Sequence, residues 1–213
     1  MIDLSLYLVT DRGLSQGRST VNVVRAAVRG GVTCVQLREK HCSAREFIAE
    51  ARAIKALLDS LETRIPLIIN DRIDLALAVG ADGVHLGQSD MPLADARRLA
   101  GKAMIIGVSA ESVEDAVRAE AEGADYLGVS PVFATPTKTD AAPPLGVDGV
   151  RSIRAAVGLP LVGIGGIHAG NAADIIRAGA DGVAVVSAIV SAACPKSAAT
   201  DLKHQILTAK QQG

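Results

Sequence analysis

The sequence predicts a single α/β domain over residues 1–213, folded as a (β/α)₈ TIM barrel. Three observations point to this class. Short runs rich in Val, Ile and Leu alternate with alanine-rich amphipathic stretches from end to end. Eight such pairs fit into 213 residues, which is the compact end of the range for this barrel. A short glycine-containing pattern also recurs four times, as expected for a barrel built from repeated units.

The apolar runs define the strands in order. Because each run is apolar throughout, both faces of the sheet are expected to be buried, which is typical of a parallel sheet covered by helices. The predicted strands lie near Ser5–Val9, Thr33–Leu37, Pro66–Ile69, Gly83–Leu86, Met104–Val108, Tyr126–Val129, Leu161–Ile164 and Gly182–Val186. Helical patterns fill the intervals, for example Ser43–Ser60, Glu111–Glu122 and Ala169–Ala178.

The recurring pattern closes a helix and leads into every second strand. Its four copies are Gly30-Gly-Val-Thr, Gly80-Ala-Asp-Gly, Gly123-Ala-Asp-Tyr and Gly179-Ala-Asp-Gly. Glycine suits the left-handed backbone conformation that ends many helices. Quarter-barrel construction would leave such a repeat, whereas an open doubly wound sheet has no reason to show it. The repeat therefore favours a closed barrel.

Composition excludes several classes of function. The net charge is −1, and two tyrosines, two phenylalanines and no tryptophan provide no platform for stacking bases, so nucleic acid is not expected as a partner. The three cysteines form no C-x-x-C pair and are expected to be reduced thiols. No signal peptide or membrane-length apolar run is evident. We expect a cytoplasmic protein that acts on small molecules, and nothing in its sequence argues against a homo-oligomer.

Polar residues follow the predicted strands, at the end where barrel enzymes place their chemistry. The second strand ends with Gln36-Leu-Arg-Glu-Lys40. With a period of two, Gln36, Arg38 and Lys40 share one side, while Leu37 and Glu39 take the other. Two cations and an amide over a barrel mouth suit a diphosphate, and Arg38 can bind it as a fork. The alternative is a solvated charged turn.

Two carboxylates follow the third and fourth strands. Asp71 lies in Ile69-Asn-Asp-Arg72 and Asp90 lies in Leu86-Gly-Gln-Ser-Asp90. Neighbouring strands are about 4.8 Å apart, so two carboxylates at equivalent strand ends can share one Mg²⁺, which takes water and phosphate oxygens as its other ligands. Alternatively, each could cap the helix that follows it. The two roles do not exclude each other.

A long proline-rich loop follows the sixth strand. The stretch from Pro131 to Leu145-Gly146 contains four of the eight prolines, so neither a helix nor an inner strand is expected. Thr135, Thr137 and Lys138 place two hydroxyl groups and a cation on this frame, which suits the binding of an oxyanion. Long loops inside compact domains are usually functional or disordered, and a polar surface loop is the alternative.

The remaining strand ends suit a phosphate group. The seventh strand ends in Gly163-Ile-Gly-Gly-Ile167 and the eighth in Val186-Ser187, the usual phosphate site of such barrels, where Gly166 permits close backbone approach. Ser109, after the fifth strand, is either a ligand or, more simply, the cap of the helix that starts near Glu111. His85 lies within its strand, where a packed, hydrogen-bonded histidine is expected. No nucleophile elbow, catalytic triad or P-loop is evident.

Over nearly its whole length, the chain resembles the thiamine-phosphate synthase family. The motifs that carry the resemblance occur in the family's order: Gln36-Leu-Arg-Glu-Lys40, Ile69-Asn-Asp-Arg72, Gly83-Val-His-Leu-Gly-Gln88 with Asp90, Thr135-Pro-Thr-Lys138, Gly163-Ile-Gly-Gly-Ile167 and Val183-Ala-Val-Val-Ser187. The family joins 4-amino-2-methyl-5-hydroxymethylpyrimidine diphosphate to a thiazole phosphate carboxylate and releases diphosphate and CO₂.

The resemblance implies a role for each matching position. Asp71 and Asp90 would hold Mg²⁺, while Ser109 and Lys138 would act in catalysis, with Ser109 beside the pyrimidine. The other implied substrate-binding residues are Gln36, Leu37, Arg38, Glu39, Lys40, Asn70 and Lys138 for the pyrimidine diphosphate, and Thr135, Pro136, Thr137, Gly166, Val186 and Ser187 for the thiazole phosphate. The chain departs from the family in having Ser130 where glycine is usual, which bears on the shape of the thiazole pocket.

Rival interpretations use the same fold. A thiazole tautomerase would need neither diphosphate nor metal, so it would have no use for Asp71, Asp90 and Lys138 together. A phosphosugar isomerase would need a paired acid and base, which the sequence does not reveal. A non-catalytic barrel that binds thiamine phosphate would retain most of these residues, and only turnover would distinguish it.

Overall fold

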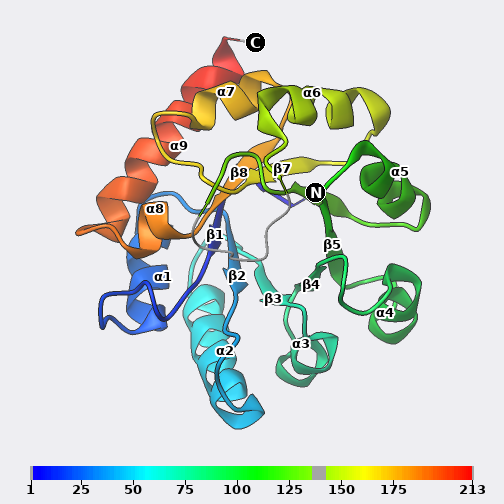
Figure 1. The fold of residues 1–213 in the computed structure, drawn as a ribbon. Helices are drawn as coiled ribbons and strands as arrows, with labels where there is room; N and C mark the ends of the chain where they lie inside the picture. Colours follow the sequence, from blue (N-terminus) through cyan, green and yellow to red (C-terminus); the bar gives the residue numbers. More distant parts are fainter. Residues whose placement is uncertain (1, 136–142, 213) are drawn as a thin grey trace.

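The computed structural model describes residues 2–135 and 143–212 and contains a closed barrel of eight parallel strands (Figure 1). Each strand pairs with the next, and β8 pairs with β1. The strands are β1 Leu6–Val9, β2 Cys34–Leu37, β3 Leu67–Asn70, β4 Gly83–Leu86, β5 Ile105–Ala110, β6 Tyr126–Val129, β7 Leu161–Ile164 and β8 Gly182–Val185. The predicted (β/α)₈ barrel is confirmed. β3 and β5 run one and two residues further than predicted.

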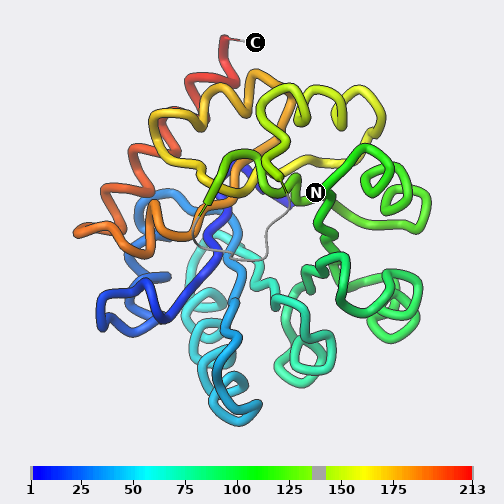
Figure 2. The backbone as a smooth tube through the Cα atoms, in the orientation of Figure 1, coloured from blue at the N-terminus to red at the C-terminus, as the bar shows by residue number. Residues whose placement is uncertain are grey.

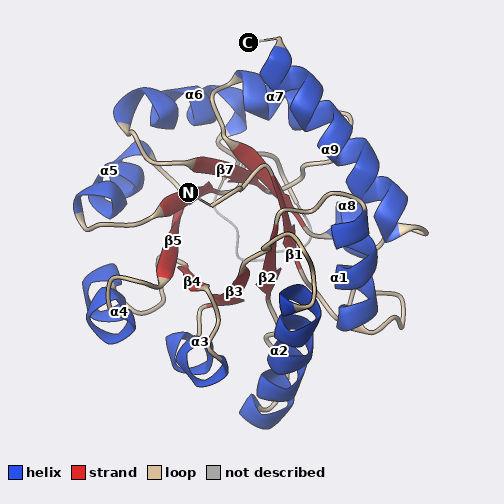
Figure 3. Ribbon diagram, turned by 180° about the vertical axis from the view of Figure 1, so that it is seen from behind, coloured by secondary structure: helices blue, strands red, loops and turns tan. Residues whose placement is uncertain are grey.

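Helices form a ring outside the strands (Figure 3). They are α1 Thr20–Arg29, α2 Ala44–Asp59, α3 Ile73–Val79, α4 Leu93–Ala100, α5 Val113–Ala121, α6 Gly146–Ala156, α7 Ala172–Arg177, α8 Ser187–Val190 and α9 Pro195–Gln211. The predicted helix Ser43–Ser60 is α2 with both its caps, and Ser43 forms a capping box with Glu46. The predictions for α5 and α7 were too long.

The chain passes once around the barrel, as the tube in Figure 2 shows. The last helix, α9, packs against both α1 and α7 and so covers the junction between the first and last strands. Two apolar layers result: a large one between strands and helices, and a smaller one inside the barrel that includes Tyr7, Cys34, Ile68, Tyr126 and Val162. Among the described residues, no helix has both the length and the apolar character needed to cross a membrane.

The four-fold repeat has a structural explanation at the amino-terminal end of the barrel. In each copy, a side-chain oxygen at the start of an even strand accepts a hydrogen bond from a backbone amide early in the odd strand before it. The four donor–acceptor pairs are Leu6–Thr33 (3.1 Å), Leu67–Asp82 (2.9 Å), Ile106–Asp125 (2.7 Å) and Leu161–Asp181 (2.8 Å). The repeat thus fastens the strands in pairs.

The glycine of the first repeat needs a correction. Gly80, Gly123 and Gly179 adopt positive φ, as predicted, but in the first copy the equivalent residue is Gly31, with φ of 104°. Gly30 has φ of −92° and instead lies against α9, where a Cβ would overlap the backbone of Lys196. The glycine at this position is required by close packing, not by its backbone conformation.

Candidate active site

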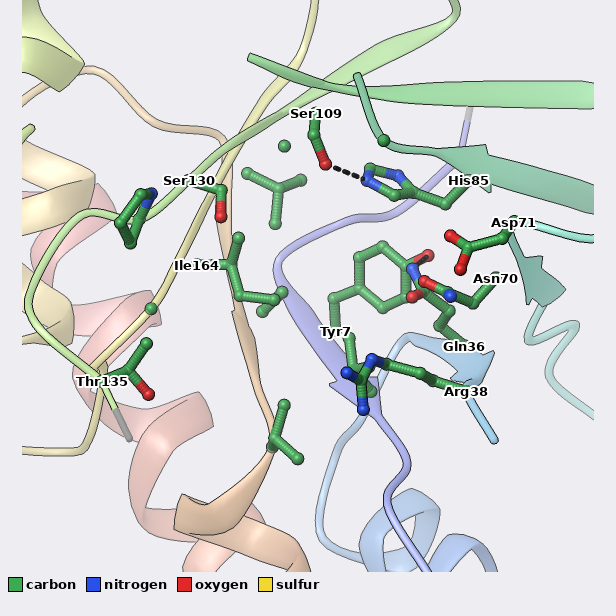
Figure 4. A pocket seen from close by; sticks show the side chains of 18 of the residues that line it. Tyr7, Gln36, Arg38, Asn70, Asp71, His85, Ser109, Ser130, Thr135 and Ile164 are labelled. Atoms are coloured by element: carbon green, nitrogen blue, oxygen red, sulfur yellow. Dashed lines mark hydrogen bonds between the residues drawn. The ribbon is translucent and has the colours of Figure 1, made fainter. Parts of the chain in front are cut away.

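A cavity of about 380 Å³ opens at the carboxyl ends of the strands. All eight strands or the segments directly after them contribute to its lining, as expected for the active site of a parallel barrel. Figure 4 shows that the labelled side chains divide between two sides of the cavity. Gln36, Arg38, Asn70 and Asp71 lie on one side, and Ser130, Thr135 and Ile164 lie on the other.

Most of the residues predicted from the sequence meet in this cavity. Those that line it are Gln36, Arg38, Lys40, Asn70, Asp71, Asp90, Ser109, Thr135, Gly166, Val186 and Ser187. In the part of the chain that the structure describes, the side chains of Leu37 and Glu39 lie outside the cavity. Leu37 is buried among the helices, and Glu39 pairs with Arg12 at 3.5 Å. Pro136, Thr137 and Lys138 fall outside the described residues.

Residues directly after β1 hold Arg38 in place on the cationic side of the cavity. Nη1 of Arg38 lies 3.3 Å from Oδ2 of Asp11, and the Arg38 backbone amide donates to the hydroxyl of Thr10 at 3.1 Å. Lys40, two residues further, projects to the same side and is exposed. This confirms the predicted alternation along residues 36–40. Asp11 orients the guanidinium without burying it, so Arg38 keeps the ability to bind an anion.

Asp71 and Asp90 lie within hydrogen-bonding distance of each other. Burial, and then the neighbouring Asp90 carboxyl, raise the pKa of Asp71 from 3.8 to about 6. Asp71 also adopts a φ of 61°, a conformation that is uncommon outside glycine, and its amide donates to the carbonyl of His85 at 2.8 Å. Oδ2 of Asp90 accepts from the amide of Gly87 at 2.7 Å. A left-handed backbone and an unfavourable charge pair at one point are typical of a functional site.

The alternative role of these two carboxylates as helix caps is wrong. α3 begins after Arg72 and α4 begins after Pro92, and in this described region neither helix start receives a side-chain cap. Asp71 is turned toward the barrel mouth by its positive φ, and Asp90 is bound to the turn after β4 instead.

Ser109 is not the cap of the helix that follows it, contrary to the simpler sequence interpretation. β5 continues through Ser109 and Ala110, which pair with Gly128 and Val129 of β6. The cap of α5 is Ser112, whose hydroxyl accepts from the amide of Asp115 at 3.1 Å. Ser109 is therefore free of capping, and its side chain faces the cavity.

His85 is hydrogen bonded through both ring nitrogens, as expected, but it also lines the cavity. Its Nε2 lies 3.0 Å from Oγ of Ser109, and its Nδ1 lies 3.0 Å from the hydroxyl of Tyr126. Tyr126 and Tyr7 also contribute to the lining, and sequence reasoning missed both. Each lies in an apolar strand, where a tyrosine is expected to belong to the hydrophobic core. The alternation of side chains along the strand, which directs both tyrosines into the barrel, could have indicated their position.

The opposite side of the cavity is built around two glycines. Gly165 and Gly166 adopt positive φ, and a Cβ on Gly166 would lie 2.7 Å from the carbonyl oxygen of Ala134. The carbonyl of Gly165 accepts from the amide of Phe133 at 3.0 Å. The glycine pair therefore lets the segment after β6 lie directly against the end of β7, which places Thr135 at the cavity.

Comparisons with known proteins identify the family of the chain. Residues 6–189 match the family model described as thiamine monophosphate synthase. A thiamine-phosphate synthase of Albidiferax ferrireducens is 58% identical over 95% of this chain and 92% of its own length. One from Chloroflexus aurantiacus is 53% identical over 100% of this chain and 97% of its own. The solved thiamine phosphate pyrophosphorylase from Pyrococcus furiosus is 40% identical, covers 97% of each chain and superposes with a TM-score of 0.90.

Proposed function

The chain belongs to the thiamine monophosphate synthase family, which makes it an alkyl-transferring enzyme of thiamine biosynthesis, and we propose how its cavity carries out that reaction. Two substrates would meet across the barrel mouth: 4-amino-2-methyl-5-hydroxymethylpyrimidine diphosphate on the side of β2 to β5, and the thiazole phosphate carboxylate on the side of β6 to β8. The products are thiamine phosphate, diphosphate and CO₂. We expect the reaction to take place in the cytoplasm.

The observation that carries this proposal is the placement of Asp71 and Asp90 beside Arg38 in one cavity. A carboxylate such as Asp71, whose pKa is raised by burial and by a neighbouring carboxylate, gains most from a shared cation. Among the described residues no cluster of three or more Asp, Glu, His or Cys side chains could hold a metal. Two carboxylates leave room for water and phosphate oxygens, the set that Mg²⁺ prefers. The donors present therefore fit Mg²⁺.

Charge stabilisation would be the main contribution of the pyrimidine side. Diphosphate leaves from a carbon attached to an electron-rich aminopyrimidine, so the bond can break before the new bond forms. Negative charge then grows on the leaving group, where Arg38, Lys40 and Lys138 would stabilise it. Bound Mg²⁺ would supply further stabilisation of the diphosphate oxygens. Asn70, between these groups, would hold the diphosphate in place.

The thiazole side would position the nucleophile. The thiazole nitrogen attacks the pyrimidine carbon, and loss of CO₂ restores the aromatic ring, so no strong base is required from the protein. Thr135, Thr137 and Gly166 would bind the phosphate, together with Val186 and Ser187 at the start of α8. Pro136 would also bind the thiazole phosphate. Ser130 lines the cavity here, and its hydroxymethyl group narrows the thiazole side relative to glycine.

One assay tests the proposal. Purified protein is given both substrates with Mg²⁺, and then with EDTA, while thiamine phosphate and diphosphate are measured. We expect both products in equal amounts, and only with the metal. Isomerisation of the thiazole carboxylate without diphosphate release would instead indicate the tautomerase. Tight binding of thiamine phosphate with no turnover would indicate a binding protein.

A further inference from the structure

Five polar side chains form a continuous hydrogen-bonded series across the inside of the barrel. Nε2 of Gln36 lies 2.9 Å from the Tyr7 hydroxyl, which lies 2.9 Å from the Tyr126 hydroxyl. Tyr126 continues to Nδ1 of His85 at 3.0 Å, and Nε2 of His85 continues to Oγ of Ser109 at 3.0 Å. The series draws on β1, β2, β4, β5 and β6, and Figure 4 shows its two ends facing the same cavity.

The backbone around this series is shaped to accommodate it. A Cβ at Gly107 would overlap the ring of Tyr126, and one at Gly128 would lie 3.0 Å from Cε1 of His85. Gly107 is the register partner of both His85 and Tyr126 in the neighbouring strands. Glycine inside a strand weakens a sheet, and it often marks a position where another group approaches the backbone closely. Here they provide the space that the two rings occupy.

The donors and acceptors along the series fix a single direction. The Gln36 amide nitrogen can only donate, so the Tyr7 oxygen accepts from it. Burial raises the pKa of both tyrosine hydroxyls well above 10, so both keep their protons. Tyr7 then donates to Tyr126, because the nearby Cys34 sulfur is a weak acceptor. Tyr126 in turn donates to Nδ1 of His85.

We propose that Tyr126 is a positioning residue that holds His85 as the Nε2–H tautomer, so that Ser109 presents its hydroxyl hydrogen to the substrate. Because His85 donates to the Ser109 oxygen, the serine proton remains available to an acceptor in the cavity. A ring nitrogen of the aminopyrimidine is an acceptor of this kind, whereas its amino group is chiefly a donor. This inference rests on the proposed function for the identity of the substrate, but the order of the hydrogen bonds does not.

The first test needs no substrate. Protein labelled with ¹⁵N-histidine is examined by two-bond ¹H–¹⁵N correlation spectroscopy, which distinguishes the two neutral tautomers. The chain has four histidines, and the signal of His85 is the one missing from a His85→Gln variant. We expect the Nε2–H tautomer. The Nδ1–H tautomer would overturn the proposal, because Tyr126 would then accept from His85 and donate to Tyr7, which reverses the order of the hydrogen bonds.

Two matched variants separate orientation from packing. Tyr126→Phe and Tyr7→Phe each delete one hydroxyl from a fully buried ring. Tyr126→Phe is expected to mix the tautomers of His85 and to lower kcat/KM for the pyrimidine diphosphate by about fivefold to tenfold, the effect of one ordinary hydrogen bond. Tyr7→Phe leaves Tyr126 able to donate to His85 and is expected to keep the Nε2–H tautomer.

The outcomes distinguish this inference from the proposed function. An unchanged tautomer in Tyr126→Phe, or the same change in both variants, would refute the role of Tyr126. Failure of the proposed function would show instead as an absence of thiamine phosphate from the wild-type protein, whatever the tautomer of His85. In that event the spectra alone decide whether the hydrogen-bond order is correct.

Discussion

Replacing Asp71 by Asn is predicted to stabilise the metal-free protein while impairing its reaction. The ordinary pKa of this carboxyl is 3.8, and burial together with Asp90 raises it to about 6. Ionising Asp71 in the folded state is therefore costly. Asn removes the charge, retains a similar shape, and is well tolerated at the positive φ of this position.

The magnitude follows from the shift in pKa. About two units at about 1.4 kcal/mol each set an upper limit near 3 kcal/mol, and solvent around a partly exposed carboxylate reduces this to about 1 kcal/mol. Because the folded pKa is raised, the folded protein binds more protons than the unfolded chain between about pH 4 and pH 6, so wild-type stability falls as pH rises through that window. Above pH 6 the full penalty is present. Asp71→Asn has no such penalty.

The assay is urea unfolding of both proteins, without Mg²⁺, from pH 4 to pH 8. The variant is expected to be more stable by about 1 kcal/mol at pH 8, with a difference that vanishes toward pH 4. Asp74→Asn is the matched control, because Asp74 pairs with Arg72 and its pKa is lowered, so its loss should not stabilise the protein at pH 8. A variant less stable than wild type at pH 8, or a difference independent of pH, would refute the reasoning.

Three further substitutions test other parts of the molecule. Lys138→Ala, outside the described residues, should slow turnover by about 30- to 1,000-fold, which is about 2–4 kcal/mol for one preorganised donor, and wild-type steady-state rates would contradict the role of the loop. Gly107→Ala should lower the free energy of unfolding by about 1–3 kcal/mol in denaturant titrations, because its methyl group overlaps the Tyr126 ring. Asp125→Ala should cost about 1–3 kcal/mol by leaving a β5 amide without its acceptor, whereas Asp201→Ala on the exposed side of α9 should cost little.

The strands and the polar strand ends could be predicted because they depend on local periodicity. Alternation alone placed Gln36, Arg38 and Lys40 at the cavity and Leu37 and Glu39 away from it. These assignments need only the direction of neighbouring side chains on one strand.

Ser109 shows where local reasoning stops. The sequence pattern predicted a helix from Glu111, which made Ser109 the candidate cap, whereas α5 begins at Val113 and is capped by Ser112. The choice depends on β6, because pairing with Gly128 and Val129 extends β5 past Ser109. The contact between Tyr7 and Tyr126 joins residues 119 positions apart, and no periodicity reports a contact of that kind.

The two ends of the barrel differ in how similar their polar residues are to one another, and we infer that one end serves stability and the other catalysis. At the amino-terminal end, Thr33, Asp82, Asp125 and Asp181 perform the same task at four equivalent positions. At the carboxyl end, the strands end in unlike groups: an amide and cations at the end of β2, a carboxylate after β3 and glycines after β7. Joining each pair of strands needs the same hydrogen bond four times, whereas binding two different substrates needs two different sets of side chains. Substitutions among the four acceptors should therefore change the free energy of unfolding and leave KM for both substrates unaltered.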